Sequence, residues 1–301
     1  MIQCFCKEYS VCFDNKNPKR NMPMHNVHIT FLGPKATYSH LAAHKYANNY
    51  FNTFIESTCC NFYLIFKKVE SGQADYAIVP IENSSVGYIK EIYELLKRTE
   101  LYIIGEIVLP IEHCMLVSPH THLHHIETIY SHAQPFQQCS LFMKNFSTCQ
   151  LKYTLSTTAA MTQVASLQSP KVAALGSEEG GKYYNLQVIA RNISNKIPNT
   201  TRFIILSREA QEVDSETPAK TTLVLSKKKK PRCLIDTLMI LRHHNIISHL
   251  RSRYANNQLW EDVFYLDLKN HLTTPTMQHA LIKIKDFSRS IRILGCYPQE
   301  K

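Results

Sequence analysis

The stretch Asp75-Tyr-Ala-Ile-Val-Pro-Ile-Glu-Asn-Ser-Ser-Val-Gly87 decides the fold class of this chain. Its apolar run from Tyr76 to Pro80 is typical of a buried strand, and polar Glu82, Asn83 and Ser84 follow directly. In open α/β sheets, ligands bind beyond the carboxyl ends of the strands. The segment therefore predicts a binding site where this strand ends.

Strand and helix patterns alternate on both sides of this stretch. We expect strands at 27–32, 76–80, 101–108, 113–117, 126–130, 171–175 and 203–206. We expect helices at 39–50, 62–71, 89–98, 135–145, 159–166 and 177–184. Such alternation predicts an α/β protein with mostly parallel sheets and helices on their faces.

The length and composition indicate a globular protein of two or three domains. Hydrophobic residues make up 44% of the 301 residues and charged residues 19%, enough to bury cores. No apolar run approaches the roughly 18 residues of a membrane span, and the N-terminus lacks the apolar segment of a secretory signal. We therefore expect a cytoplasmic protein without a membrane partner, whose ten scattered cysteines stay reduced.

The net charge of +10 fits either nucleic-acid binding or an enzyme for an acidic substrate. The most basic run, Lys227 to Arg232, has no interleaved aromatic residues for base stacking. A solvated loop is the better interpretation of that run, so we expect no nucleic-acid partner.

Two composition shifts divide the chain. Residues 1–26 are polar and without period, which predicts a flexible extension, and the acidic stretch 209–219 is typical of a linker. Beyond it we expect strands at 221–226, 246–254, 262–268 and 291–297, with helices at 234–242 and 276–284. The order βαββαβ is the ferredoxin-like arrangement.

Four sets of residues, the opening stretch among them, carry a resemblance to a known family. They are Gly33 to Ser39, Asp75 to Gly87, Ser131 to Cys139, and Ser156 to Ala160 with Gly176 to Glu179 and Asn199 to Phe203. In order and spacing they resemble the prephenate dehydratases. The stretch after the linker, above all Leu259 to His271, resembles the ACT regulatory domain that follows many of these enzymes.

The resemblance implies a bilobed catalytic part like the periplasmic binding proteins, at 27–208, with a second lobe at about 105–188. Its site would lie in the cleft between the lobes, and an ACT-like domain would occupy 220–299. The implied enzyme is a carbon–oxygen lyase that converts prephenate to phenylpyruvate for phenylalanine biosynthesis, as a homodimer or homotetramer without a cofactor. We expect it to be monofunctional, because residues 1–26 are too few for fused chorismate mutase helices.

Two alternatives stay open. An arogenate dehydratase would act on the amino-acid analogue of prephenate, and its pocket would differ in subtle residues. The other alternative is not an enzyme but a bilobed module that binds a carboxylate without converting it. The retained Thr201 and Arg202 argue against this alternative.

The family pattern assigns catalytic roles to four residues. Thr201 matches the essential threonine, whose hydroxyl hydrogen-bonds the leaving group, while Glu82, His132 or water is the candidate proton source. Arg202 suits a bidentate carboxylate clamp, although an arginine beside an apolar strand is as often a structural ion-pair partner. His132 in a turn is likewise more often structural than acidic.

Substrate-binding roles fall on hydrogen-bonding residues and one aromatic residue of the matching segments. These are Asn83, Ser84, Ser131, Gln134, Thr157 and Phe203. For any polar one alone, turn or helix capping is the commoner role of its type, and only the family pattern reverses that preference.

The remaining candidates concern metal and effector sites. His120, His122, His124 and His125 lack a partnering Cys or carboxylate at ligand spacing, so we expect no metal there.

The expected effector pocket is degenerate, because bulk and positive charge replace the glycine and glutamate of phenylalanine-sensing relatives. Its residues are Arg232, Cys233, Leu234, Arg251, Ser252 and Arg253. We therefore expect weak or no inhibition by phenylalanine.

Overall fold

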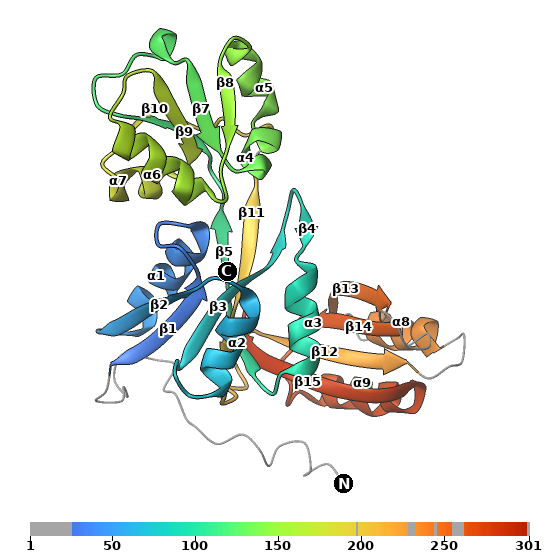
Figure 1. Ribbon diagram of the computed structural model, residues 1–301. Coiled ribbons are helices and arrows are strands. Elements are labelled where there is room, and N and C mark those ends of the chain that lie inside the picture. The colour runs from blue at the N-terminus through green and yellow to red at the C-terminus, as the bar shows by residue number, and fades with distance from the viewer. Residues whose placement is uncertain (1–25, 197, 228–232, 244–245, 255–261, 300–301) are drawn as a thin grey trace.

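The computed structural model describes residues 26–196, 198–227, 233–243, 246–254 and 262–299, with backbone only for 227, 233–234, 247–254 and 262. Two α/β lobes and a C-terminal α/β domain make up the described chain (Figure 1). No helix among the described residues is long and apolar enough to cross a membrane.

The first lobe is built on a mixed sheet in the order β2-β1-β3-β11-β5, with β4 paired to β3. Its strands are β1 (Val27–Leu32), β2 (Phe54–Cys59), β3 (Tyr76–Asn83), β4 (Gly87–Tyr88), β5 (Tyr102–Pro110) and β11 (Thr200–Ser207). Its helices are α1 (Tyr38–Tyr50), α2 (Phe62–Glu70) and α3 (Lys90–Arg98). Helix α1 packs on one face and α2 with α3 on the other, because the strand side chains alternate between the two faces.

The second lobe is formed by the chain between β5 and β11 and has a sheet in the order β10-β6-β9-β7-β8. Its strands are β6 (Cys114–Val117), β7 (Thr128–Ser131), β8 (Gln150–Tyr153), β9 (Val172–Gly176) and β10 (Gln187–Ala190). Its helices are α4 (Ala133–Gln138), α5 (Ser140–Met143), α6 (Thr157–Leu167) and α7 (Glu178–Tyr183), with 3₁₀ turns η2 (Leu123–His125) and η3 (Lys144–Phe146). Two connections, 111–113 and 191–199, join the lobes near the ends of β5 and β11 (Figure 1).

The two-lobed architecture confirms the expected fold class, but the prediction of mostly parallel sheets is wrong. Strand β11 pairs antiparallel with both β3 and β5, and β6 pairs antiparallel with both β9 and β10. These strands enter or leave a lobe through the connections between the lobes. They therefore run against the strands that βα units add within each lobe.

The C-terminal domain has the expected βαββαβ order and an antiparallel sheet in the order β13-β14-β12-β15. Its elements are β12 (Ala219–Lys227), α8 (Cys233–His243), β13 (Ile247–Tyr254), β14 (Asp262–Leu268), α9 (Pro275–Phe287) and β15 (Ser288–Pro298). This is the ferredoxin-like topology predicted from the sequence.

Both faces of this C-terminal sheet are covered. Leu223 and Leu266 face α8 and α9, whereas Val224 and Tyr265 face the first lobe and share its core beneath α2 and α3. The Tyr265 hydroxyl donates to the backbone carbonyl of Tyr93 on α3 at 2.5 Å. The C-terminal domain is thus packed into the first lobe, and not merely tethered by residues 208–218.

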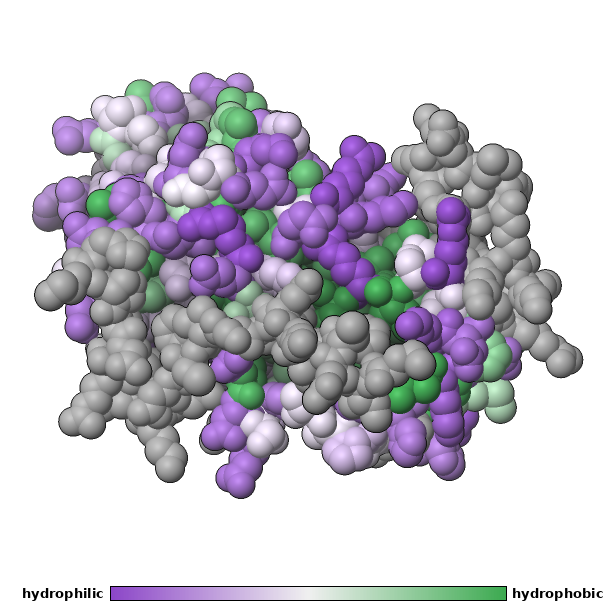
Figure 2. Space-filling model, turned by 90° about the horizontal axis from the view of Figure 1, so that it is seen from below, coloured by the Kyte–Doolittle hydropathy of each residue, from purple (hydrophilic) through white to green (hydrophobic). Residues whose placement is uncertain are grey.

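Hydrophilic residues cover much of the surface seen from below, and hydrophobic residues gather toward the C-terminal domain (Figure 2). On its helices, Ile235, Met239 and Ile282 are each more than half exposed. Large exposed apolar side chains mark an interaction surface where they form a contiguous patch.

Candidate functional site

The polar ends of β3 and β11 lie side by side, because Thr201 pairs with Asn83 in the antiparallel ladder. Asn83 Nδ2 donates to Thr201 Oγ1 at 2.9 Å and to Asn199 Oδ1 at 3.0 Å. Asn83 Oδ1 accepts from the backbone N–H groups of Ser85 and Val86, which fixes the orientation of the amide. The buried Asn83 side chain is therefore a fixed donor directed at the Thr201 hydroxyl.

Thr201 is only 8% exposed, and its hydroxyl oxygen accepts this hydrogen bond. Within the described residues its own proton has no acceptor. A hydroxyl that accepts one hydrogen bond becomes a better donor for a second, because polarisation passes along the chain of bonds. Thr201 is thus prepared to donate to an oxygen atom bound at this end of the sheet.

Ser84 and Asn199 complete the polar cluster of the first lobe. Ser84 Oγ accepts from the Thr200 N–H at 2.9 Å, and the Ser84 N–H donates to the Thr200 carbonyl at 2.8 Å. Asn199 Oδ1 accepts from Asn83 and from Ser85 Oγ. Asn199 Nδ2 is buried and has no partner among the described residues.

A pocket between the lobes adjoins this cluster. It is lined by Ser85, Val86, Gln134, Gln137, Gln138, Ser194, Asn195, Lys196 and Asn199. Gln138 Nε2 and Asn199 Nδ2 are buried amide donors without partners among the described residues, and Lys196 adds a positive charge. A buried donor without an acceptor costs about 1–3 kcal/mol, which a ligand oxygen atom would recover. The lining therefore suits an anion with several oxygen acceptors.

The second lobe contributes the residues around the start of α4. Ser131 ends β7, is fully buried, and has a hydroxyl without a partner among the described residues. His132 is the N-cap of α4, and its Nδ1 accepts from the Gln134 N–H at 3.3 Å. The observed contact of His132 is thus a helix-capping one, while the exposed Gln134 lines the pocket.

Residue His113 lies in the connection between β5 and β6 and contacts both lobes. Its Nε2 is 2.7 Å from Gln138 Oε1, and its Nδ1 is 3.4 Å from the hydroxyl of Tyr38 on α1. The Tyr38 hydroxyl donates to the backbone carbonyl of Glu112 at 3.0 Å. Burial lowers the pKa of His113 and raises that of Tyr38, so both side chains are neutral near pH 7.

The profile of the family described as prephenate dehydratase matches residues 29–211 of the chain. The bifunctional chorismate mutase/prephenate dehydratase of Enterobacter agglomerans is 52% identical over 277 residues, which cover 92% of this chain and 72% of that protein. The chain belongs to the prephenate dehydratase family. It is therefore a lyase that eliminates water and carbon dioxide, and the identity to this relative favours prephenate over arogenate as its substrate.

Two solved structures share the whole arrangement. Prephenate dehydratase from Arthrobacter aurescens, in complex with L-Phe, is 27% identical with a TM-score of 0.80, over 91% of this chain and 90% of that one. GqqA, described as a novel type of quorum quenching acylase, is 26% identical with a TM-score of 0.81, over 91% of this chain and 98% of that one. Both similarities extend across the lobes and the C-terminal domain.

Two of the residues assigned to catalysis lie away from the pocket in this dehydratase. Arg202 pairs with Glu82 in the ladder and points to the opposite face of β11 from Thr201. Its Nε donates to Glu106 at 2.7 Å, its Nη1 to Asp267 at 2.6 Å and its Nη2 to the Tyr297 hydroxyl at 3.1 Å. Arg202 is thus the structural ion-pair partner that the sequence left open, and not a free carboxylate clamp.

The Arg202 contacts lie at the interface between the first lobe and the C-terminal domain. Burial alone would lower the pKa of Arg202, but Asp267, Tyr297 and Glu106 outweigh it and hold that pKa well above its ordinary value. Glu106 also pairs with Lys220, and Glu82 lines a small cavity at this interface together with Arg202. The predicted roles of Arg202 as clamp and Glu82 as acid therefore find no support in their positions.

Two assigned binding residues have other surroundings. Phe203 is 1% exposed and packs in the core beneath α1, so it supports the sheet and does not line the pocket. Thr157 is the first residue of α6 and half-buried, next to Ser156, whose hydroxyl caps the helix by accepting from the Ala159 N–H. Thr157 is not part of the pocket lining that the described residues form.

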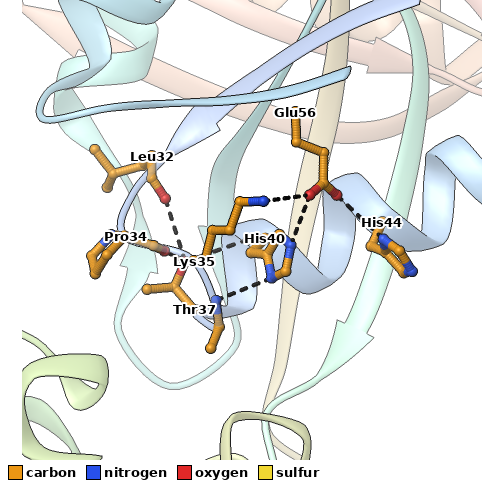
Figure 3. A network of polar contacts seen from close by, with 8 residues as sticks. Leu32, Pro34, Lys35, Thr37, His40, His44 and Glu56 are labelled. Carbon is orange, nitrogen blue, oxygen red and sulfur yellow. Dashed lines mark hydrogen bonds and ion pairs between the residues drawn. The ribbon is translucent and has the colours of Figure 1, made fainter. Parts of the chain in front are cut away.

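A cluster that the sequence did not single out joins α1 to β2 (Figure 3). Among the described residues, His40, His44 and Glu56 are the ones whose ligand atoms converge as they would around a metal ion. However, the Ala36 N–H donates to His40 Nδ1 at 3.0 Å, so the neutral ring carries its proton on Nε2, which faces Glu56. Lys35 also lies 3.4 Å from Glu56. The geometry is that of an ion-pair network holding the loop before α1.

The histidine loop gives no comparable convergence. The rings of His124 and His125 have centroids 4.1 Å apart, and His122 lies 5.7 Å from each. All three rings belong to exposed residues of η2 or its cap.

Four residues of this region that contribute donors, charge or contacts were missed from the sequence, namely Asn199, Gln138, Lys196 and His113. The first two lie within quoted family segments, and strand alternation places Asn199 on the same face as Thr201. Gln138 is four residues after Gln134 and so shares its helix face. His113 had no sequence signal of this kind, because only the fold brings it to Gln138.

The expected effector pocket and the basic run lie largely outside the described structure. Arg232 is outside the described residues, and only the backbone is described for Cys233, Leu234, Arg251, Ser252 and Arg253. Residues 228–231 of the basic run and residues 1–25 are also outside. The expectations about these residues stay predictions.

Proposed function

We propose that prephenate binds in the pocket between the lobes with its leaving hydroxyl group against Thr201. The observation that carries this proposal is the hydrogen bond from Asn83 Nδ2 to Thr201 Oγ1, which leaves the Thr201 proton for the substrate. The unpartnered amide donors of Asn199 and Gln138, with the charge of Lys196, support binding of the two substrate carboxylates.

The chemistry needs little more than orientation. As prephenate loses carbon dioxide, the electrons of the broken carbon–carbon bond form the aromatic ring and expel hydroxide from the opposite carbon. Aromatisation drives the step, so the protein contributes positioning and a donor for the departing oxygen atom. Thr201 supplies that hydrogen bond, and Asn83 keeps the hydroxyl pointed toward the substrate.

The proton that converts hydroxide to water comes from solvent in this proposal. A threonine hydroxyl is too weak an acid to give up its proton for good. Glu82 points toward the C-terminal domain, and His132 caps α4 through its Nδ1. Neither position supports the role of proton donor beside Thr201.

The test compares Thr201→Val with Thr201→Ser in the presence of a chelator, with phenylpyruvate formation followed by absorbance. Loss of the hydroxyl in Thr201→Val should reduce turnover by about two to three orders of magnitude, the scale for losing a transition-state hydrogen-bond donor. Thr201→Ser retains the hydroxyl and should stay within roughly tenfold of the natural enzyme. Normal turnover in Thr201→Val would remove Thr201 from the mechanism.

Ser131, Gln134, Ser84 and Thr157 complete the proposed set of groups that hold the substrate. The buried, unpartnered Ser131 hydroxyl and the pocket position of Gln134 support their assignment directly. Ser84 acts by fixing the backbone at Thr200, and Thr157 rests on the family resemblance alone.

We also propose that the catalytic part covers 27–208, that 220–299 are a regulatory domain, and that the enzyme forms a cytoplasmic dimer or tetramer. The exposed Ile235, Met239 and Ile282 on α8 and α9 support association. Light scattering of the purified chain would test it, and a monomer at all concentrations would contradict it.

A further inference from the structure

The residue His113 stands at a point where it can control the chemistry of the pocket without touching the substrate. It is 2% exposed, and the backbone carbonyl of His113 accepts from the Ile193 N–H, so both connections between the lobes hold it. Its ring bridges Tyr38 of the first lobe and Gln138 of the second. The backbone of His113 is thus held by the second connection, and its ring contacts one residue of each lobe.

A neutral imidazole ring carries one proton, and its position determines how the Gln138 amide is turned. With the proton on Nε2, the ring donates to Gln138 Oε1, and the Gln138 NH₂ group faces away from His113. With the proton on Nδ1, Gln138 must donate to Nε2, and its carbonyl oxygen faces the pocket instead. The two tautomers of His113 thus present opposite polarity to a ligand.

The contact with Gln138 favours the first tautomer, in which Nδ1 is an acceptor and can share the Tyr38 hydroxyl proton with the Glu112 carbonyl. Gln138 Oε1 lies 2.7 Å from His113 Nε2, Gln138 Nε2 is a buried donor without a partner among the described residues, and Gln138 is one of the residues that line the pocket. A dicarboxylate offers only acceptors at its charged ends, and hydrogen bonds from N–H groups to ions are about twice as strong as neutral ones. A carbonyl oxygen in the same place would repel the ligand.

We propose that His113 is a positioning residue, whose Nε2 proton holds the Gln138 amide with its NH₂ group toward the anionic substrate. The inference rests on the proposed binding of prephenate in this pocket. In this proposal His113, which lies in the connection between the lobes, keeps the Gln138 amide in the orientation that binds an anion.

The kinetic test uses His113→Leu, His113→Gln, Gln138→Leu and the double variant His113→Leu/Gln138→Leu. His113→Leu should raise KM for prephenate roughly tenfold or more, as Gln138→Leu should, because each removes the oriented donor. The double variant should be no worse than Gln138→Leu alone, since both act through one group. His113→Gln places an amide N–H near the former Nε2 and should restore most of the affinity.

A second measurement needs no substitution. The ¹⁵N resonances of the His113 ring, in the intact protein with phenylpyruvate as the ligand, report which nitrogen bears the proton. The proposal requires the Nε2 tautomer, and protonation at Nδ1 would overturn it even if His113→Leu failed to fold.

The kinetic outcomes separate this inference from the proposed function. If Gln138→Leu raises KM but His113→Leu does not, the role of His113 is refuted and the pocket stands. If the losses of His113→Leu and Gln138→Leu multiply in the double variant, the two residues act independently and the inference fails. A normal KM in Gln138→Leu would overturn both.

Discussion

Replacement of Arg202 by Met should destabilise the protein and leave its chemistry almost intact. The guanidinium group contacts Glu106, Asp267 and Tyr297 at distances between 2.6 and 3.1 Å, and the Arg202 side chain is only 13% exposed. Removing one partner of a buried ion pair costs about 3–5 kcal/mol, because the other charge stays buried without compensation. Lys220 still neutralises Glu106 in the variant, so we expect the lower end of that range.

The unfolding free energy from urea denaturation gives the first readout, and kcat and KM for prephenate give the second. Arg202→Met should unfold at lower urea concentration, with turnover of the folded enzyme within roughly threefold of normal. Arg191→Met is the matched control, since Arg191 makes a similar two-pronged contact with Glu178 but is exposed, and should leave the stability nearly unchanged.

The double variant Arg202→Met/Asp267→Leu isolates the cause. Exchange of a whole buried pair for apolar side chains is often neutral, so the double variant should regain much of the stability that Arg202→Met loses. Unchanged stability in Arg202→Met, together with a loss of turnover of a hundredfold or more, would refute the structural role. Arg202 would then be the substrate clamp that the sequence first suggested.

Three further predictions concern the interface, the pH response and regulation. Gly295→Ala should weaken the packing of β15 on β5 and lower the melting temperature, because a Cβ there would lie 1.9 Å from the Ile103 carbonyl oxygen. In the control Gly105→Ala the new Cβ lies 3.5 Å from the nearest side-chain atom, so the melting temperature should change little. Burial lowers the pKa of His113, so below pH ~6.5 the unfolded chain binds a proton at this residue that the folded chain does not, and the free energy of unfolding should fall with acidification. In His113→Gln the dependence of the unfolding free energy on pH should become flatter by up to one proton, about 1.4 kcal/mol per pH unit. Phenylalanine should inhibit the enzyme weakly or not at all, and micromolar binding in calorimetry with inhibition would contradict the degenerate-pocket prediction.

Local sequence patterns were sufficient for most elements of the first lobe and the C-terminal domain. The expected strand 27–32 matches β1, and the expected helix 89–98 nearly matches α3, whose Ile92, Tyr93 and Leu96 form one buried stripe. The expected helix 135–145 is instead broken into α4, α5 and η3. Strands β2, β8 and β10 were missed, since their side chains are mostly exposed or half-buried and give no apolar run.

The direction of strands and the exposed faces of their side chains depend on the tertiary fold. The alternation of side chains along a strand predicts that Thr201 and Arg202 point in opposite directions, but it does not predict which of them faces the pocket. That choice is made by the C-terminal domain, which covers the Arg202 face with Asp267 and Tyr297. Motif resemblance grouped both residues as catalytic because it ignores the faces of the strand.

The three consecutive residues Thr201, Arg202 and Phe203 meet three different parts of the molecule. Thr201 contacts Asn83 in the polar cluster beside the pocket, Arg202 contacts the C-terminal domain, and Phe203 packs in the core beneath α1. The β3–β11 register shifts between Arg202 and Phe203, so an irregularity of the ladder lies within the triplet. Such an irregularity is tolerated where neighbouring groups hold the backbone from both sides. The ion pairs of Arg202 and the packing of Phe203 therefore stabilise β11, whereas only Thr201 of the three presents its side chain to the polar cluster beside the pocket, so Arg202→Met should lower stability and leave turnover nearly unchanged.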